Sequence, residues 1–255
     1  MMIPREPTPR SSIDESKYIA AECPIHGWFV SGIRNSTNPR SLNNAVRYFA
    51  GGCPRCAAER KSKAIFEQSL IPPRFANKNF ENYSVSGSCQ QAVFETCKEF
   101  ADKIIENIQN GRGLLLIGTP GTGKTHLGCS ILSEAIWQGK TALFTTVGKM
   151  LSKIKTAWVA GAAVSQDELV KRFTEVEILV LDEIGAYRSL TEREKDLLFE
   201  IVNERYEQMH STIFISNLQL SGRDSIDKYL EERIMDRICE QAQVLICNWE
   251  SYRRN

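Results

Sequence analysis

The sequence predicts an α/β protein built on a parallel sheet that helices cover on both faces. Short apolar runs without alternation, such as Leu114–Ile117 and Ile178–Leu181, are typical of strands buried on both faces. Stretches with apolar residues at helical spacing alternate with these runs along the chain. A glycine-rich loop joins the first of these runs to such a helical stretch, which is the order of elements in a parallel α/β sheet.

The N-terminal part of the chain has a different character. Residues 1–20 are polar and proline-containing, so we expect a flexible N-terminus there. Residues 21–62 hold a dense patch of Cys, His, Gly and aromatic residues. Residues 63–88 are predicted as a connector, because the two prolines of Ile71–Arg74 interrupt any helix. The regular α/β pattern then predicts one larger domain over 89–255.

Two short chelating pairs lie in the cysteine-rich patch, with the patterns C-x₂-H and C-x₂-C. Together they supply four nitrogen and sulfur ligands, the number that a closed tetrahedral zinc site uses. A module of about 40 residues builds little core, so a metal would supply most of its folding free energy. The alternative is a loose segment that contains cysteines by chance. The predicted zinc ligands are Cys23, His26, Cys53 and Cys56.

Aromatic and cationic residues surround these pairs, and they suit either single-stranded nucleic acid or a protein partner equally well. They are Trp28, Phe29, Arg34, Arg40, Arg47, Tyr48, Phe49, Arg55, Arg60, Lys61 and Lys63. The remaining cysteines fall in or beside regular elements, and we interpret them as small buried residues.

The larger domain begins with an amphipathic helix predicted over 90–109. The loop after Leu114–Ile117 then fits G-x-x-x-x-G-K-[ST], which favours a phosphate cradle at a helix N-terminus over a chance glycine loop. Lys124 can reach the β- and γ-phosphates of ATP, and the Thr125 hydroxyl can bind Mg²⁺. The predicted ATP-binding residues are Gly118, Thr119, Pro120, Gly121, Thr122, Gly123, Lys124, Thr125 and His126.

Asp182 and Glu183 stand at the C-terminal end of the strand Ile178–Leu181, where open α/β sheets place their ligands. Asp182 would hold Mg²⁺ through water, and Glu183 would orient or deprotonate the attacking water. The alternative is that this acidic pair simply begins a solvated turn. The position downstream of a complete phosphate loop favours catalysis, and therefore an ATPase.

The alternation of strands and helices continues to the C-terminus. Further elements are predicted as a strand at Thr141–Thr145, a helical region over 148–173, a helix over 191–209, a strand at Thr212–Ser216, a helix over 226–239 and a strand at Gln243–Asn248. The helical region carries cations and an aromatic residue that suit a nucleic-acid edge. These are Lys149, Lys153, Lys155 and Trp158.

Polar residues near the C-terminus add to the predicted site. Asn217 ends a strand predicted beside the acidic one, which resembles the sensor position of AAA+ ATPases, although a simple turn residue would also fit. Arg233 and Arg237 share one helical face, which suits an arginine finger delivered to the ATP of a neighbouring subunit. Taken alone, these two arginines are explained better by a solvated helix face paired with nearby carboxylates than by an arginine finger.

Residues 71–84 and 110–255 resemble the DnaC family of bacterial and phage helicase loaders, relatives of the IstB transposition ATPases. The motifs are Gly118–Leu127, Val180–Gly185, Ile215–Leu218, Glu232–Ile238 and Asn248–Arg253. The resemblance implies Arg237 as the arginine finger, Arg233 as its companion and Arg253 as a sensor arginine acting in cis. It also implies a compact AAA+ P-loop NTPase domain without a helical lid, which assembles into an oligomer on single-stranded DNA. The Cys/His module departs from enterobacterial DnaC and resembles zinc-bearing modules of other loaders.

Composition limits the possible binding partners and the cellular compartment. The net charge of +1 indicates no strong global field for nucleic acid or membrane. No apolar run approaches the roughly 18 residues of a membrane span, and no signal peptide is evident, so we expect a cytoplasmic protein with thiol or metal-bound cysteines.

We therefore predict a Mg²⁺-dependent ATPase that loads a replicative helicase onto single-stranded DNA, with a zinc module that recruits the helicase. The predicted catalytic residues are Lys124, Asp182, Glu183, Asn217, Arg233, Arg237 and Arg253. The alternatives are an IstB-like ATPase that assists a transposase, a small-molecule P-loop kinase, and an ATP-gated binding module with negligible turnover.

Overall fold

The computed structural model describes residues 8–14, 17–33, 47–48, 52–159, 161–186, 189–222 and 225–253. The chain divides into two compact units, Met1–Ala64 and Ile65–Asn255. Parts of the predicted flexible N-terminus, at 1–7 and 15–16, lie outside the described residues, as do Arg34, Arg40 and Phe49. The domain boundaries drawn from the sequence stay predictions.

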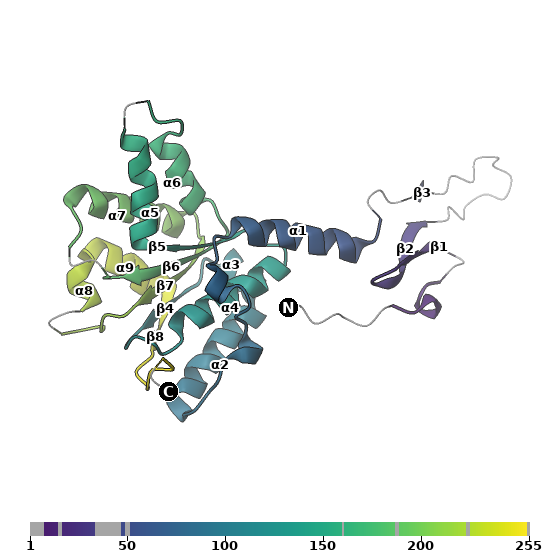
Figure 1. Ribbon diagram of the computed structural model, residues 1–255, viewed down its shortest axis with the longest axis horizontal. Coiled ribbons are helices and arrows are strands. Elements are labelled where there is room, and N and C mark those ends of the chain that lie inside the picture. The colour runs from purple at the N-terminus through teal and green to yellow at the C-terminus, as the bar shows by residue number, and fades with distance from the viewer. Residues whose placement is uncertain are drawn as a thin grey trace. The chain divides into compact units, whose positions relative to one another are not determined.

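The N-terminal unit contains a small antiparallel sheet (Figure 1). Strands β1 (Tyr18–Cys23) and β2 (Gly27–Ile33) form a hairpin, and β3 (Arg47–Tyr48) pairs with β2. Gly27 has a φ of 71°, in the left-handed region that favours glycine, and it closes the turn between β1 and β2. The sheet is followed by α1 (Pro54–Gln68), which begins directly after Cys53.

The larger unit is built on a five-stranded parallel sheet in the order β5-β6-β7-β4-β8, which confirms the predicted fold class (Figure 1). Its strands are β4 (Gly113–Ile117), β5 (Ala142–Thr146), β6 (Ile178–Ile184), β7 (Ser211–Ser216) and β8 (Ala242–Ile246). Each predicted strand is present within a few residues, and β6 continues through Asp182 and Glu183.

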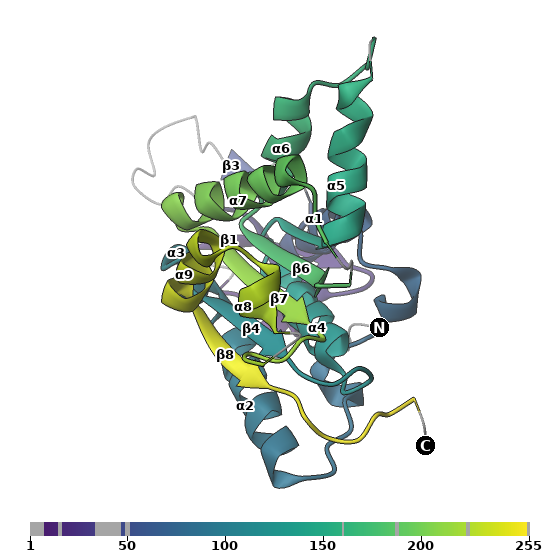
Figure 2. The ribbon, with the colours of Figure 1, turned by 90° about the vertical axis from the view of Figure 1, so that its left-hand side faces the viewer.

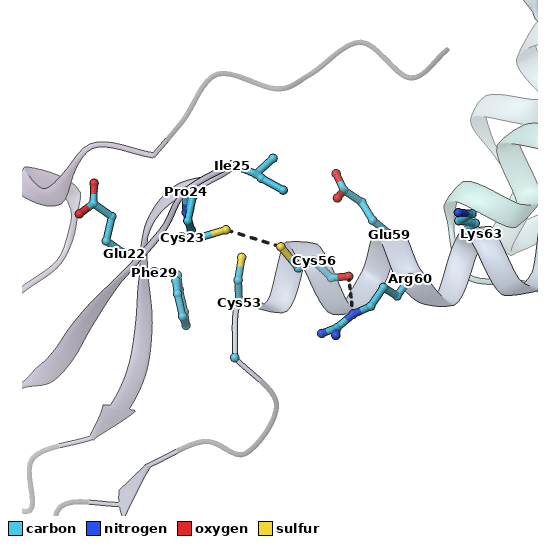
Figure 3. A pocket seen from close by; sticks show the side chains of 11 residues that line it. Glu22, Cys23, Pro24, Ile25, Phe29, Cys53, Cys56, Glu59, Arg60 and Lys63 are labelled. Carbon is cyan, nitrogen blue, oxygen red and sulfur yellow. Dashed lines mark hydrogen bonds between the residues drawn. The ribbon is translucent and has the colours of Figure 1, made fainter.

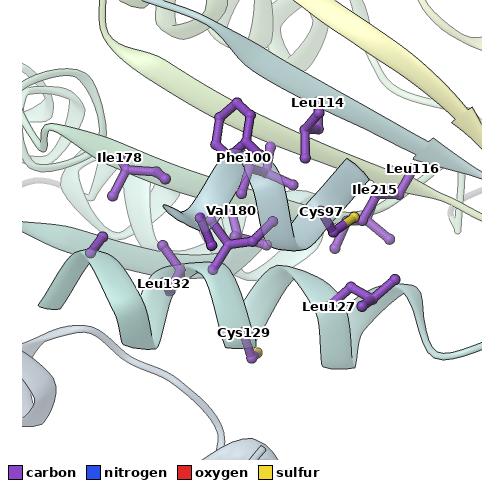
Figure 4. Packing of buried hydrophobic residues seen from close by; sticks show 14 of the residues in the cluster. Cys97, Phe100, Leu114, Leu116, Leu127, Cys129, Leu132, Ile178, Val180 and Ile215 are labelled. Carbon is purple, nitrogen blue, oxygen red and sulfur yellow. The ribbon is translucent and has the colours of Figure 1, made fainter. Parts of the chain in front are cut away.

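Helices cover both faces of this sheet. They are α2 (Ser88–Asp102), α3 (Ile104–Gln109), α4 (Lys124–Trp137), α5 (Val147–Lys155), α6 (Gln166–Thr174), α7 (Glu192–Glu207), α8 (Ile226–Tyr229) and α9 (Glu232–Gln241). Leu114 and Leu116 belong to one core cluster with α2, α3 and α4 (Figure 4). Leu115 and Ile117 belong to a second cluster with the remaining five helices. Successive residues of one strand thus face opposite layers.

Two predicted helices are each divided in the structure. The helix over 90–109 is interrupted at Lys103 (φ −100°, ψ 24°), and the Asn107 side-chain amide donates to the carbonyl of Phe100 at 2.9 Å. The helix over 226–239 is interrupted at Leu230, which is extended and buried in the core. In both places, side-chain packing and hydrogen bonding outweigh helical continuity.

The interpretation of the remaining cysteines is correct only in part. Cys97, Cys129 and Cys247 are buried, whereas Cys89 and Cys239 are exposed. Cys89 lies in the first turn of α2, and Cys239 lies on the side of α9 away from the core. None of the described helices combines the length and the apolar character that a membrane span needs.

Candidate nucleotide site and metal centre

The loop between β4 and α4 has the backbone geometry of a phosphate cradle. Gly118, Gly121 and Gly123 have φ values of 132°, 86° and 89°, which residues with a side chain rarely adopt. Helix α4 begins immediately after Gly123, at Lys124, so the loop leads into a helix N-terminus. Backbone N–H groups and the helix dipole there favour an anion.

The polar side chains of the cradle meet the acidic strand end. Thr125 Oγ1 donates to Asp182 Oδ2 at 2.7 Å, so a hydroxyl and a carboxylate lie side by side, as a Mg²⁺ site of a P-loop protein requires. Lys124 Nζ donates to the carbonyls of Gly118 (2.8 Å) and Thr119 (2.7 Å). Burial lowers the pKa of Lys124 and raises the pKa of Asp182, so both groups favour a partner of opposite charge.

A cleft of about 400 Å³ opens at this point, within the size range of small-molecule sites. It brings together most of the residues predicted for the nucleotide. Those that line it are Pro120, Gly121, Thr122, Gly123, Lys124, Thr125, His126, Asp182, Glu183, Asn217 and Arg253. Gly118, Thr119, Arg233 and Arg237 are not among its lining residues.

A hydrogen bond joins the ends of β6 and β7, so that Asn217 and Glu183 line the same cleft. Ser216 Oγ donates to the carbonyl of Ile184 at 2.7 Å and accepts from the N–H of Leu218 at 3.1 Å. Glu183 itself has a φ of 58°, a strained conformation of the kind that gathers at functional sites. Ser216 lies in the motif Ile215–Leu218, but sequence reasoning gave it no role, since a serine at a strand end carries no local signal of this contact.

The segment after β8 lies against the phosphate loop and forms hydrogen bonds with it (Figure 2). The Thr119 N–H donates to Asn248 Oδ1 at 3.2 Å, and the Trp249 indole N–H donates to the carbonyl of Thr122 at 3.0 Å. A Cβ on Gly118 would lie 2.4 Å from the Cys247 carbonyl oxygen, so glycine permits this close approach. The motif Asn248–Arg253 therefore holds the loop in shape, and it also brings Arg253 to the cleft.

The connector supplies another wall that sequence reasoning missed. Tyr83 is buried and donates through its hydroxyl to the carbonyl of Thr122 at 3.1 Å. Its ring lies edge-on to His126, whose Nε2 is 2.9 Å from the carbonyl oxygen of Asn79. Arg74 and Lys78 also line the cleft. The connector thus belongs structurally to the nucleotide site; the resemblance covered residues 71–84, but no site residue was predicted there.

Arg233 and Arg237 lie outside this cleft and pack against α7. The Arg233 guanidinium lies 4.2 Å from the centroid of the Phe199 ring and pairs with Asp196 at 2.9 Å. Arg237 Nε donates to Asn203 Oδ1 at 3.1 Å, and its guanidinium lies 4.7 Å from the centroid of the Tyr206 ring. Both side chains therefore face the same neighbouring helix.

The nucleic-acid edge predicted in the helical region is only partly free. The Trp158 indole N–H donates to Gln166. The guanidinium carbon of Arg193 lies over the Trp158 ring, 3.5 Å from the ring centroid. Lys155 pairs with Glu194. The exposed cations of the predicted group are Lys149 and Lys153 on α5.

The four predicted zinc ligands converge in the N-terminal unit, and Figure 3 shows the three cysteines among them. Their ligand atoms all lie within 4.8 Å of one another. Cys23 Sγ is 3.5 Å from Cys56 Sγ, and His26 Nδ1 is 3.7 Å from Cys53 Sγ. A Zn–S bond of about 2.3 Å gives sulfur–sulfur separations of about 3.8 Å in a tetrahedron, so the donor set fits zinc.

The electrostatics of the cluster also suit a cation. Backbone N–H groups of Ile25 and His26 lower the pKa of the Cys23 thiol to about 6, which favours the thiolate that metals bind. The Cys23 sulfur in turn raises the pKa of Cys56 to about 11. An ionised Cys23 therefore opposes the ionisation of Cys56, and a bound cation would relieve that repulsion.

The sheet order, the phosphate loop and the acidic strand end together define a P-loop NTPase of the AAA+ class. Residues 56–255 match the sequence model of a family described as IstB-like ATP binding protein. The chain is 31% identical over 209 residues to the replicative helicase loader DnaC of Escherichia coli K12, covering 80% of this chain and 82% of that protein. The chain therefore belongs to the IstB/DnaC family of ATP-binding AAA+ proteins.

Solved structures agree with this assignment. A crystal structure of the DnaC helicase loader matches with a TM-score of 0.61 and 25% identity, over 69% of this chain and 99% of that one. AMPPCP-bound DnaA from Aquifex aeolicus matches with a TM-score of 0.57 and 21% identity, over 72% and 53% of the two chains, which supports the fold alone. The small-molecule kinase alternative finds no support.

Replacing Lys124 with alanine is expected to abolish the stabilisation of the protein by ATP, because the charge at the β- and γ-phosphates is lost. Ligand at a hundredfold excess over Kd stabilises a protein by about 2.7 kcal/mol. Thermal melting with and without ATP–Mg²⁺ measures this effect, with Lys171→Ala, an exposed lysine on α6, as control. An undiminished shift in Lys124→Ala would place the ATP site elsewhere.

Proposed function

We propose that the chain is a Mg²⁺-dependent ATPase that helps to load a replicative helicase onto single-stranded DNA. The similarity to DnaC over four fifths of both chains carries this proposal. The convergence of Lys124, Thr125, Asp182 and Glu183 at one cleft supports the ATPase part. Similarity to curated DnaC proteins favours the loader over the transposition alternative.

Each residue of the cleft has a proposed task in hydrolysis. Lys124 binds the phosphates, and Glu183 orients the attacking water and accepts its proton. Asn217, from the adjacent strand end, contacts the γ-phosphate and the same water. Thr125 and Asp182 would hold Mg²⁺, which neutralises charge on the phosphates when bound. Arg253, which also lines the cleft, would sense the phosphates within its own chain.

Arg237 would act on the ATP of a neighbouring subunit, with Arg233 as its companion. Neither side chain lines the cleft of its own chain, which supports action across a subunit boundary. Self-assembly of the AAA+ domain is therefore part of the proposal. Single-stranded DNA would contact exposed cations of this domain, among which Lys149 and Lys153 are candidates.

The N-terminal unit would bind one zinc ion and recruit the helicase. The match to the family begins at residue 56, so the hairpin that carries Cys23 and His26 lies outside the region shared with the family. A separate recruiting role is consistent with that position. Affinity purification from the native host, with mass spectrometry, tests the partner: a replicative helicase is expected, and a transposase in its place would contradict the proposal.

Purified protein is expected to contain about one zinc per chain, because the Cys₃His donor set of the described residues supplies one tetrahedral site. Removal of the metal should unfold the N-terminal unit, which has little other core, while the ATP-induced melting shift of the larger unit remains. Elemental analysis and circular dichroism measure the two effects. Protein prepared without chelators that contains no zinc would refute the assignment.

A further inference from the structure

Glu59, which no sequence pattern singled out, contacts the metal-site histidine from the side away from the sulfurs. His26 Nε2 lies 2.8 Å from Glu59 Oε1. The other ring nitrogen, Nδ1, lies 3.7 Å from Cys23 Sγ and 3.3 Å from Cys56 Sγ. The two nitrogens of one ring therefore have separate partners, a carboxylate on one side and the thiol cluster on the other.

We propose that Glu59 positions His26 so that the metal is bound through Nδ1; this inference rests on the proposed zinc site. A neutral imidazole has one N–H and one lone pair, and an ionised carboxylate only accepts hydrogen bonds. The contact with Glu59 therefore keeps the proton on Nε2. The lone pair of Nδ1 is left facing the sulfurs, where the metal belongs.

The position of Glu59 in the sequence explains how one helix supplies both a metal ligand and the carboxylate that contacts His26. Glu59 follows Cys56 by three residues on α1, and residues at this spacing lie on the same helical face. One turn of α1 thus presents a ligand sulfur and a carboxylate to the β1–β2 hairpin. The side chain of His26 is 6% exposed and that of Glu59 is 44% exposed, so the buried ring has a hydrated, charged acceptor.

Other contacts of His26 hold its backbone, and Glu59 contacts the ring atom Nε2. The Thr8 N–H and Arg55 Nη1 both donate to the His26 carbonyl, at 3.0 Å and 3.4 Å. These bonds fix the turn that carries the residue. Rotation of the imidazole about its own side-chain bonds is restrained by the bond from Nε2 to Glu59, so this residue sets which nitrogen faces the metal.

The first test compares zinc affinity by chelator competition in Glu59→Ala, Glu59→Gln and a matched control, Glu67→Ala, an exposed glutamate on the same helix. Loss of such a carboxylate is expected to weaken zinc binding about 10- to 100-fold. Glu67→Ala should bind within about twofold of the parent. Glu59→Gln should lose less than Glu59→Ala, because its amide oxygen still accepts from Nε2–H. Parent-like affinity in Glu59→Ala would overturn the proposal.

The second test determines which ring nitrogen of His26 is protonated and which binds the metal. It uses the unmodified, zinc-loaded protein. Two-bond ¹H–¹⁵N correlation of the imidazole should show His26 protonated at Nε2 and metal-bound at Nδ1; the chain has three histidines to assign. Zinc bound through Nε2 would overturn the proposal, whether or not Glu59→Ala folds. Parent protein that binds no zinc would refute the zinc site itself, which distinguishes the two failures.

Discussion

Replacing Arg237 with alanine is expected to lower the ATPase rate of the assembled protein on the order of 10³-fold, the contribution typical of an arginine finger. The fold and the nucleotide affinity should change little, because Arg237 does not line the cleft of its own chain. Steady-state ATP hydrolysis at saturating nucleotide measures the loss. Arg172→Ala, which removes an exposed arginine from α6, is the matched control and should hydrolyse ATP like the parent.

A mixture of two inactive variants separates action between subunits from action within one. Lys124→Ala subunits bind no ATP but can donate Arg237, whereas Arg237→Ala subunits bind ATP and need a donor. If sites are shared, the mixture should regain part of the activity that neither variant has alone. No recovery, in a mixture shown by size to co-assemble, would mean that Arg237 acts within its own chain or has no part in hydrolysis.

Replacing Glu183 with glutamine is expected to lower turnover about 10²- to 10⁴-fold while ATP still binds. Glutamine keeps the shape of the side chain and removes the carboxylate that accepts a proton from water. Its backbone position, at a φ of 58°, is no more strained for glutamine than for glutamate, so the fold should persist. Single-turnover hydrolysis and nucleotide binding measured on one preparation separate the two effects.

The control for this variant is Glu175→Gln, at the exposed end of α6. It makes the same chemical change away from the cleft and should leave turnover intact. Tight ATP binding with parent-like hydrolysis in Glu183→Gln would remove Glu183 from the mechanism and leave water activation to another group.

The sheet and the phosphate loop could be predicted because their signals are local in the sequence. Uninterrupted apolar runs such as Leu114–Ile117 identify buried strands without knowledge of their neighbours. The loop pattern fixes its own backbone geometry through its glycines. The order of the strands then brings Asp182 and Thr125 together, since parallel strands end at the same edge of the sheet.

What the sequence did not reveal depends on partners that are distant along the chain. Tyr83 lies in the segment 71–84 and Trp249 in the motif Asn248–Arg253, but neither pattern predicts that both side chains donate to the carbonyl of Thr122. Glu59 is one of many helical glutamates until the fold places His26 beside it. Such contacts are products of tertiary structure, and no pattern within a short window encodes them.

Arg205 illustrates the same limit for a charged residue. Its position on the amphipathic helix α7 does not predict burial of a charge, yet only 1% of it is exposed. The guanidinium donates to Thr212 Oγ1 and to the carbonyls of Phe173 and Ser211. Burial lowers its pKa to about 9. Neutral acceptors from α6 and β7 satisfy this cation, and only the folded chain brings them together.

The most direct test of the proposed loader function is transfer of the host replicative helicase to circular single-stranded DNA. Purified helicase and DNA are incubated with ATP–Mg²⁺, with the parent protein or with Lys124→Ala, and the helicase retained on the DNA is quantified after separation by size. The parent protein is expected to increase retained helicase, and Lys124→Ala is not. Retention that is equal with and without the parent protein would contradict a role in helicase loading.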